Sequence, residues 1–96
     1  MALTYDPEKN ARNIALRGLS FDLVEALDWD NAVAIASDRE SYGEERIKVL
    51  ARLEGVLHVA VVTPRGEDLR VISFRRASRA ERRLYEQHVD TRSRGV

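Results

Sequence analysis

The chain has 96 residues and no cysteine, and its 16 basic and 16 acidic side chains give a formal net charge of zero. These values are typical of one small domain with a packed core, and they exclude disulfides, thiolate metal sites and cysteine nucleophiles. No apolar run reaches the roughly 18–20 residues of a membrane span, and no signal-peptide pattern is present, so we expect one soluble, cytoplasmic domain over residues 1–96 with a flexible tail at about 90–96.

The first part of the chain predicts two helices. Asp6 followed by Pro7 is a typical helix start, and Gly18 supplies the left-handed residue that ends a helix over residues 7–17. Ser20 is placed to cap a second helix that runs to about Leu27.

The apolar pattern then changes to a period of two. We expect strands over residues 33–36, 46–54, 56–63 and 69–74, with a polar loop at 37–45 and turns at 54–55 and 64–66. Short connections favour an antiparallel meander, and Ser78 with Glu81 forms a capping box that opens a C-terminal helix. The expected fold class is α+β, with two N-terminal helices, a four-stranded antiparallel sheet and a C-terminal helix.

The charges are unevenly distributed along the chain. Residues 1–60 carry eleven acids and seven bases, a net charge of −4, whereas residues 61–96 carry five acids and nine bases, a net charge of +4. This asymmetry indicates an anionic or acidic partner for the basic half. A solvated arginine-rich helix face explains the same pattern equally well on the sequence alone.

Six arginines lie between Leu69 and Tyr85, with Glu81 as the only acid among them: Arg70, Arg75, Arg76, Arg79, Arg82 and Arg83. A guanidinium binds phosphate oxygens two at a time, so this segment, with Ser73 and Tyr85 close in sequence, is a candidate site for a phosphodiester. Strict alternation puts Arg70 and Arg75 on opposite faces of a regular strand. Either the strand ends near Phe74 and the chain turns Arg75 or Arg76 into the groove, which we favour, or only one of these bases belongs to the site.

Other chemistry has little support in the sequence. There is no HExxH, no metal-ligand spacing and no glycine-rich nucleotide motif, so we expect neither a metal nor a cofactor. His58, inside an apolar strand, is better explained as a hydrogen-bonded core residue than as a catalyst. Lys9, Asn13 and Arg17 share one helix face, which is more typical of a solvated surface than of a contact with RNA or a partner.

The order of elements and motifs resembles the BrnT family of bacterial type II toxins, small ribonucleases with a RelE-like fold. The matching segments are Tyr5-Asp6-Pro7-x-Lys9-Asn10-x-x-Asn13, Gly18-Leu19-Ser20-Phe21, Gly43-Glu44-Glu45-Arg46, Thr63-Pro64-Arg65-Gly66, Arg70-Val71-Ile72-Ser73-x-Arg75-x-Ala77 and Glu81-Arg82-x-x-Tyr85. They cover residues 5–85. The chain departs from the family pattern at Leu16-Arg17, where Lys-His is usual, and at Phe74, where a smaller residue is usual.

The resemblance implies a metal-independent endoribonuclease that blocks translation and growth. The reaction needs deprotonation of the 2′-hydroxyl, stabilisation of the phosphorane and protonation of the leaving oxygen. The expected catalytic residues are Arg70, Arg75 and Arg76, which would hold phosphate, and Tyr85, which would orient the nucleophile or donate a proton. The expected RNA contacts are Lys9, Ser73, Arg79 and Arg82. No residue is an obvious general base.

The resemblance also implies a cognate antitoxin with a ribbon-helix-helix domain, through which the complex would bind operator DNA, and an acidic or amphipathic antitoxin segment would cover the arginine cluster. The expected substrate is RNA, free or on the ribosome. Mutation of Arg70 or Arg75 to Ala is expected to abolish growth inhibition and leave folding intact.

Two other functions stay open at this point. One is a toxin of the same superfamily that inhibits a protein target such as gyrase, which intact RNA in arrested cells would indicate. The other is a non-catalytic RNA- or partner-binding module, against which the scattered aromatic residues argue.

Overall fold

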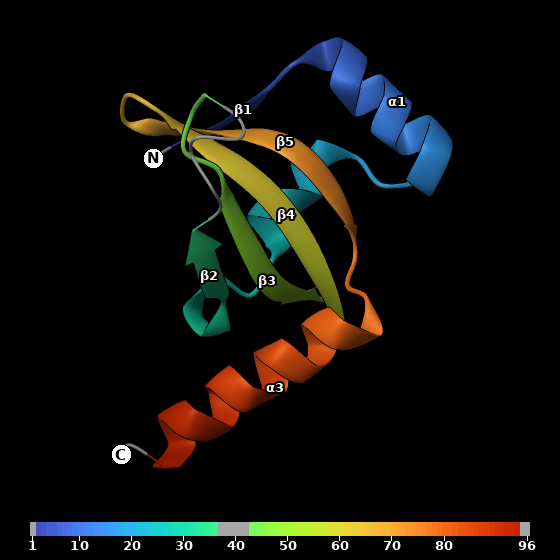
Figure 1. Ribbon diagram of the computed structural model, residues 1–96. Helices are drawn as coiled ribbons and strands as arrows, with labels where there is room; N and C mark the ends of the chain where they lie inside the picture. The colour runs from blue at the N-terminus through green and yellow to red at the C-terminus, as the bar shows by residue number, and fades with distance from the viewer. Residues whose placement is uncertain (1, 37–42, 95–96) are drawn as a thin grey trace.

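The computed structural model describes residues 2–36 and 43–94, with side chains described for 2–36 and 43–89. A mixed five-stranded sheet in the order β1-β5-β4-β3-β2 forms its centre (Figure 1). The strands are β1 Leu3–Tyr5, β2 Val33–Ala36, β3 Ile47–Leu53, β4 Val56–Arg65 and β5 Asp68–Arg76. The helices are α1 Pro7–Arg17, the 3₁₀ segments η1 Phe21–Ala26 and η2 Trp29–Asn31, and α3 Arg79–Arg94.

Strands β2 to β5 form the expected antiparallel meander, so the α+β class is confirmed. The expectation of a four-stranded, purely antiparallel sheet is wrong, because β1 adds a fifth strand that runs parallel to β5 and pairs Leu3 with Leu69 and Tyr5 with Val71. Three residues are too few to show a period of two, and the partner strand lies far along the chain. No local pattern could therefore reveal this pairing.

The helix caps and the turn between β3 and β4 are present where the sequence predicts them. Asp6 Oδ1 accepts a hydrogen bond from the Glu8 amide at 2.9 Å, and Gly18 ends α1 in the left-handed region with φ 69°. Ser20 caps the next segment as expected, but six residues form 3₁₀ turns instead of the expected α-helix. Glu54 and Gly55, at φ 49° and 83°, make the turn between β3 and β4.

The second hairpin is longer than expected. The turn expected at 64–66 is displaced, because β4 continues through Pro64 to Arg65 and Pro64 lies opposite Leu69 of β5. The pairing of β4 with β3 ends at Val62. Pro64 therefore has a neighbouring strand on one side only. Proline is tolerated at such an edge position of a sheet, because it has no N–H to donate to a second strand.

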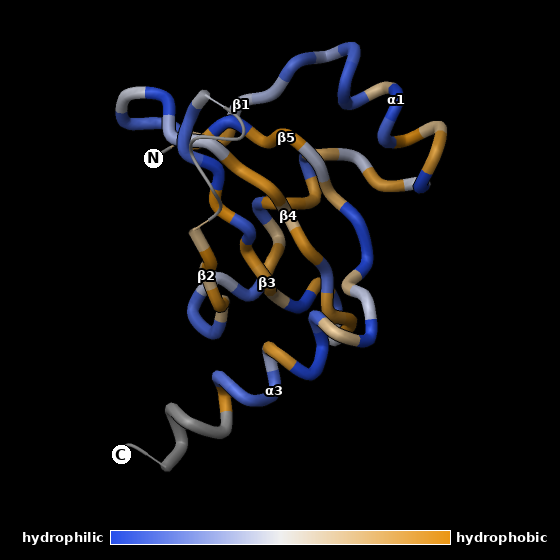
Figure 2. Tube along the Cα trace, viewed as in Figure 1, coloured by the Kyte–Doolittle hydropathy of each residue, from blue (hydrophilic) through white to orange (hydrophobic). Residues whose placement is uncertain are grey.

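The two faces of the sheet are covered differently. On one face, η1 packs Phe21 and Val24 against Val71 and Phe74 of β5, and η1 passes behind the sheet in the view of Figure 1. On the other face, α3 lies across one end, where Tyr85 is buried against a cluster of aliphatic side chains that are Val33, Leu50, Leu57 and Val59. Figure 2 shows the apolar residues concentrated along the central strands, whereas α3 is mostly polar. The described helices leave the rest of this second face uncovered.

Asn13 joins α1 to the sheet. Its side chain is buried, and its Nδ2 donates to the carbonyl oxygens of Leu19 at 2.8 Å and Phe74 at 2.9 Å. The expectation that Asn13 belongs to a solvated polar face is therefore wrong. The amide satisfies two backbone carbonyls at a junction of α1, its following loop and β5.

Two expectations about the whole chain stay predictions. One is a single domain over residues 1–96, and the other is a flexible tail at 90–96, of which residues 90–94 lie in α3 and 95–96 fall outside the described residues. Among the described helices, none is long and apolar enough to cross a membrane.

Candidate catalytic face

A β-bulge in β5 gathers polar side chains on the uncovered sheet face. Ser73 pairs with Val61 and Val71 with Val62, so Ile72 has no partner residue in β4. This extra residue shifts the alternation by one position, as bulges near functional sites commonly do. Arg70, Ser73 and Arg75 therefore share one face, opposite Thr63, Val61 and Val59 of β4.

The expectation that β5 ends near Phe74 is wrong. The strand continues to Arg76, and Arg70 and Arg75 lie on the same face because of the bulge. Lys48 of β3, opposite Val61, is on this face too. We call the surface formed by Lys48, Arg70, Ser73 and Arg75 the catalytic face.

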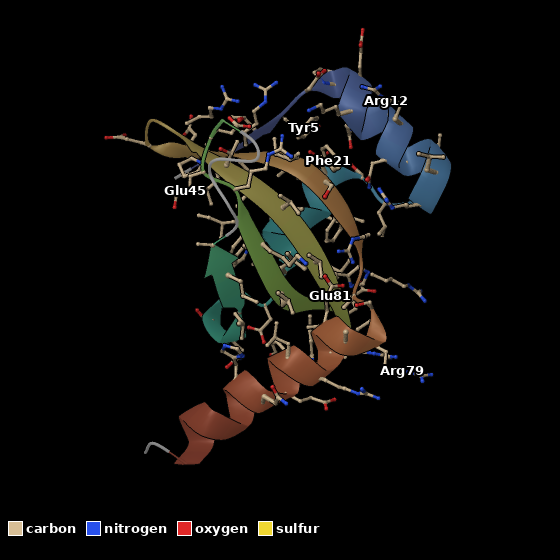
Figure 3. All side chains as sticks on the ribbon, viewed as in Figure 1. Tyr5, Arg12, Phe21, Glu45, Arg79 and Glu81 are labelled. Atoms are coloured by element: carbon tan, nitrogen blue, oxygen red, sulfur yellow. The ribbon has the colours of Figure 1, made fainter. Side chains whose placement is uncertain are left out.

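Glu81 of α3, which is labelled in Figure 3, binds two of the cations on this face. Arg75 donates from Nη1 to Glu81 Oε1 at 2.7 Å and from Nη2 to Oε2 at 2.9 Å. Lys48 Nζ donates to the same Oε2 at 2.9 Å. The capping box expected from the sequence is also formed, with the Ser78 amide donating to Glu81 Oε1 at 2.8 Å and the Glu81 amide to Ser78 Oγ at 3.2 Å. One carboxylate thus fixes the start of α3 and the positions of two cations.

These contacts set the charge states of the pair. Hydrogen bonds from Arg75, and then from Ser78 and Lys48, hold the pKa of the Glu81 carboxyl well below its ordinary value, although burial alone would raise it. The same carboxylate raises the pKa of Arg75. Glu81 therefore stays ionised at neutral pH and acts as a fixed acceptor, which makes it a poor proton acceptor for catalysis.

The cations keep donors that Glu81 does not use. The ammonium of Lys48 has three N–H groups, of which one is bonded to Glu81. Arg75 has five N–H groups, of which two are bonded to Glu81 and one to the Arg76 carbonyl at 3.3 Å. Within the described residues, the side chains of Arg70 and Ser73 have no hydrogen bond or ion pair. The face can therefore offer several N–H donors to one phosphate.

Tyr85 is not part of this face. Its side chain is 2% exposed, its hydroxyl donates to the Asn31 carbonyl at 3.2 Å, and the Arg52 guanidinium lies 5.0 Å from its ring centre. A phenol enclosed in this way packs α3 against the sheet.

The other expected site residues are dispersed. Arg76, opposite His58, lies on the sheet face that packs against η1. Lys9 is on α1, and Arg79 and Arg82 are exposed on α3, as Figure 3 shows for Arg79. The Arg76 carbonyl accepts a hydrogen bond from Arg75 Nη1 at 3.3 Å, but within the described residues no side-chain hydrogen bond or ion pair joins these four residues to the catalytic face.

The histidines and acids give no sign of a metal centre. His58 is buried with Nδ1 2.8 Å from the Val56 carbonyl, and its ring stacks at 5.3 Å on Phe74, in agreement with the core role expected for it. In residues 2–36 and 43–89, no three His, Asp or Glu side chains come close enough to hold an ion.

One member of the catalytic face, Lys48, and the acid that binds it, Glu81, were not expected as site residues from the sequence. Lys48 lies on the wet side of a strand, where any polar residue is expected, and Glu81 was interpreted only as a helix cap. A weak signal for Glu81 existed, because it is the only acid among six arginines and a buried acid there must find a cation.

Comparisons with known proteins agree on one family. The family model described as "Ribonuclease toxin, BrnT, of type II toxin-antitoxin system" matches residues 5–81. The crystal structure of the Brucella abortus ribonuclease toxin BrnT is similar, with a TM-score of 0.67 and 28% identity over 82% of this chain and 99% of that one. No curated protein sequence matches this chain.

Proposed function

Because this chain belongs to the BrnT family of ribonuclease toxins of type II toxin–antitoxin systems, we propose that it cleaves RNA on the catalytic face without a metal ion. The observation that carries the proposal is the arrangement of Arg75 and Lys48 around Glu81, with Arg70 on the same face. These cations can supply the positive charge that RNA cleavage requires.

We assign the roles from the available donors. Arg70, which has no partner in the described part of the chain, binds the scissile phosphate, and the remaining N–H groups of Arg75 and Lys48 stabilise the charge that develops on the phosphorane. Ser73, between Arg70 and Arg75 on β5, contacts a phosphate or ribose oxygen. Lys48, whose ammonium keeps N–H groups that Glu81 does not use, is the proposed donor of the proton to the leaving 5′-oxygen.

Glu81 is a positioning residue in this proposal. It orients Arg75 and Lys48 before RNA binds, so their geometry costs no rearrangement during the reaction. In the described part of the chain, no hydrogen bond or ion pair joins Arg70 to a carboxylate or histidine, and we assign no general base. The rate therefore comes from positioning and electrostatic stabilisation, and we expect slow turnover on free RNA.

The remaining sequence-based assignments change in weight. We leave Tyr85 and Arg76 out of the proposed catalytic set, because Tyr85 is buried and Arg76 lies on the opposite sheet face. Arg79 and Arg82 stay as proposed outer contacts for RNA along exposed α3, and Lys9 is a weaker proposed contact on α1.

A toxin of this class has a cognate antitoxin. We propose that the antitoxin carries a ribbon-helix-helix domain that brings the complex to operator DNA. We also propose that the RelE-like arrangement of the sheet presents the catalytic face to messenger RNA in the cytoplasm, either free or on the ribosome. Cleavage there would block translation and growth.

The test is a map of RNA ends after induction. Cells that express the wild type are expected to accumulate discrete new RNA ends and stop growing, whereas cells that express Arg70→Ala keep intact RNA and grow. Purified wild-type protein is expected to cleave free RNA equally well with and without EDTA. Growth arrest with intact RNA would refute cleavage and indicate a protein target, and loss of cleavage in EDTA would refute metal independence.

A further inference from the structure

A cleft lies on the sheet face that packs against η1, and at the end of β5 it reaches Arg75 of the catalytic face. Its volume is about 840 Å³, and it is bounded by the end of α1, by η1, by the β3–β4 hairpin and by the end of β5. Its walls include Leu19, Leu23, Leu53 and Val56, with His58 on the floor. A cleft of this size accommodates several side chains of a partner.

Exposed apolar side chains concentrate around this cleft. In the described part of the chain, the large apolar residues that are exposed are Ile14, Leu16, Leu23 and Val56, with exposures from 37% to 80%. Leu23 and Val56 line the cleft, and Leu16 precedes its rim residue Arg17. Figure 2 shows apolar residues at the C-terminal end of α1, which borders the cleft. Exposed apolar side chains that line a cleft are typical of a protein-binding site.

The rim of the cleft favours an acidic partner. Arg17 and Arg76 line it, and neither forms an ion pair with a residue in the described ranges; Arg17 donates only to the Asn13 amide oxygen at 3.2 Å. Arg75, which reaches the cleft at the end of β5, is neutralised by Glu81. Glu54 is the one acid of the lining. Carboxylates on a partner would pair with the two free guanidinium groups.

We propose that this cleft binds the cognate antitoxin through an amphipathic segment whose apolar side chains enter the cleft and whose carboxylates meet Arg17 and Arg76. The proposal rests on the family membership, which implies an antitoxin, but it does not depend on how RNA is cleaved. It places the antitoxin next to Arg75 at the end of β5 and not over Lys48, Arg70 and Ser73, which do not line the cleft.

The experiment measures binding of the purified cognate antitoxin to toxin variants by calorimetry. All variants carry Arg70→Ala, so that toxicity does not limit their expression. Leu23→Glu and Val56→Glu are each expected to raise the dissociation constant at least about tenfold, because each places a charge at an apolar contact and against an acidic partner. Leu23→Lys is expected to raise it less than Leu23→Glu. Ile14→Glu is the matched control, since Ile14 is exposed on α1 but does not line the cleft.

Two controls make the outcome decisive. Circular dichroism melting identifies any variant that fails to fold, and Arg17→Glu, at an exposed rim position, provides an independent test that should also weaken binding. If the cleft variants bind as tightly as Ile14→Glu, the proposal is wrong. If Lys48→Ala alone abolishes binding, the antitoxin covers the catalytic face instead. Neither result bears on RNA cleavage, which the map of RNA ends tests separately.

Discussion

Replacement of Glu81 by Gln tests the central contact of the catalytic face. The substitution keeps the size of the side chain but removes a charge that receives two hydrogen bonds from Arg75, one from Lys48 and one from the Ser78 amide. Breaking a buried ion pair costs about 3–5 kcal/mol. Because the side chains of Arg75 and Lys48 are 33% and 38% exposed, water screens part of this cost. We expect Glu81→Gln to lower the free energy of unfolding by about 2–3 kcal/mol.

The assay is urea unfolding at pH 7, followed by circular dichroism. A loss of this size corresponds to a decrease in Tm of about 10–20 °C for a domain of this length. Ser78→Ala is the matched control. It removes only the hydroxyl that accepts a hydrogen bond from the Glu81 amide at 3.2 Å, and it leaves the ion pairs intact. It is expected to cost about 1 kcal/mol, as removal of a helix cap usually does.

The pH dependence of the difference between wild type and Glu81→Gln isolates the charge. The folded pKa of Glu81 lies far below the ordinary value of 4.5, so the unfolded state takes up the proton first as the pH falls. The stabilisation is therefore fully present above about pH 5 and is lost by about 1.4 kcal/mol per pH unit below 4.5. Other acids titrate in both proteins and cancel in the difference.

The reasoning would be refuted by either of two results. One is a loss smaller than that of Ser78→Ala, which would mean that the ion pairs contribute nothing to stability. The other is a difference that stays the same at pH 3.5 and pH 7, which would mean that the charge of Glu81 is not what matters.

The other variants separate catalytic from structural roles. Arg70→Ala is expected to lower the rate of RNA cleavage by about 100-fold or more. The Tm is expected to stay unchanged, because the Arg70 side chain has no partner among the described residues. A rate near that of the wild type in a single-turnover assay would remove Arg70 from the mechanism. Tyr85→Phe is expected to keep full toxicity in a growth assay and to cost about 1 kcal/mol in urea unfolding, because only the bond to Asn31 is lost; loss of toxicity in a folded protein would restore a catalytic role. Asn13→Ala is expected to cost about 2–3 kcal/mol, since two carbonyls lose their donor, and a neutral result would contradict the role of Asn13 in joining α1 to β5.

The structure also changes one expectation about Arg75. The sequence predicted that Arg75→Ala would leave folding intact, but Arg75 is the bidentate partner of the buried carboxylate of Glu81. Truncation of Arg75 would leave that charge with Lys48 as its only charged partner, so we expect a loss of stability as well as of activity. Arg70→Ala is therefore the better test of catalysis.

Signals that involve neighbours in sequence predicted the fold well. The Asp6 and Ser20 caps, the Glu54-Gly55 turn and the Ser78–Glu81 capping box each depend on residues within three positions, and all are present. The features that the sequence did not show depend on distant partners. The position of β1 depends on β5, and the side chain of Asn13 is held by the Phe74 carbonyl.

The candidate site was predicted only in part, for the same reason. Arg70, Ser73 and Arg75 were identified from the density of arginines, but the face that they share depends on a bulge at Ile72, which no residue type marks. Under strict alternation, Arg70 and Arg75 would lie on opposite faces of β5. Arg76 was therefore an equally acceptable candidate for the site in place of Arg75. Lys48 could not be found from the local pattern because its role arises from a carboxylate in another element.

The pairing of β1 with β5 has a consequence for the biosynthesis of the protein. The first strand to leave the ribosome has its partner 66 positions later, and the acid that positions Arg75 follows after that. Translation adds about 5–20 residues each second, so the N-terminal strand waits without its partner for several seconds. The catalytic face is assembled only when nearly the whole chain has emerged. A product that stalls before Glu81 therefore lacks the carboxylate that holds Arg75 and Lys48 in place.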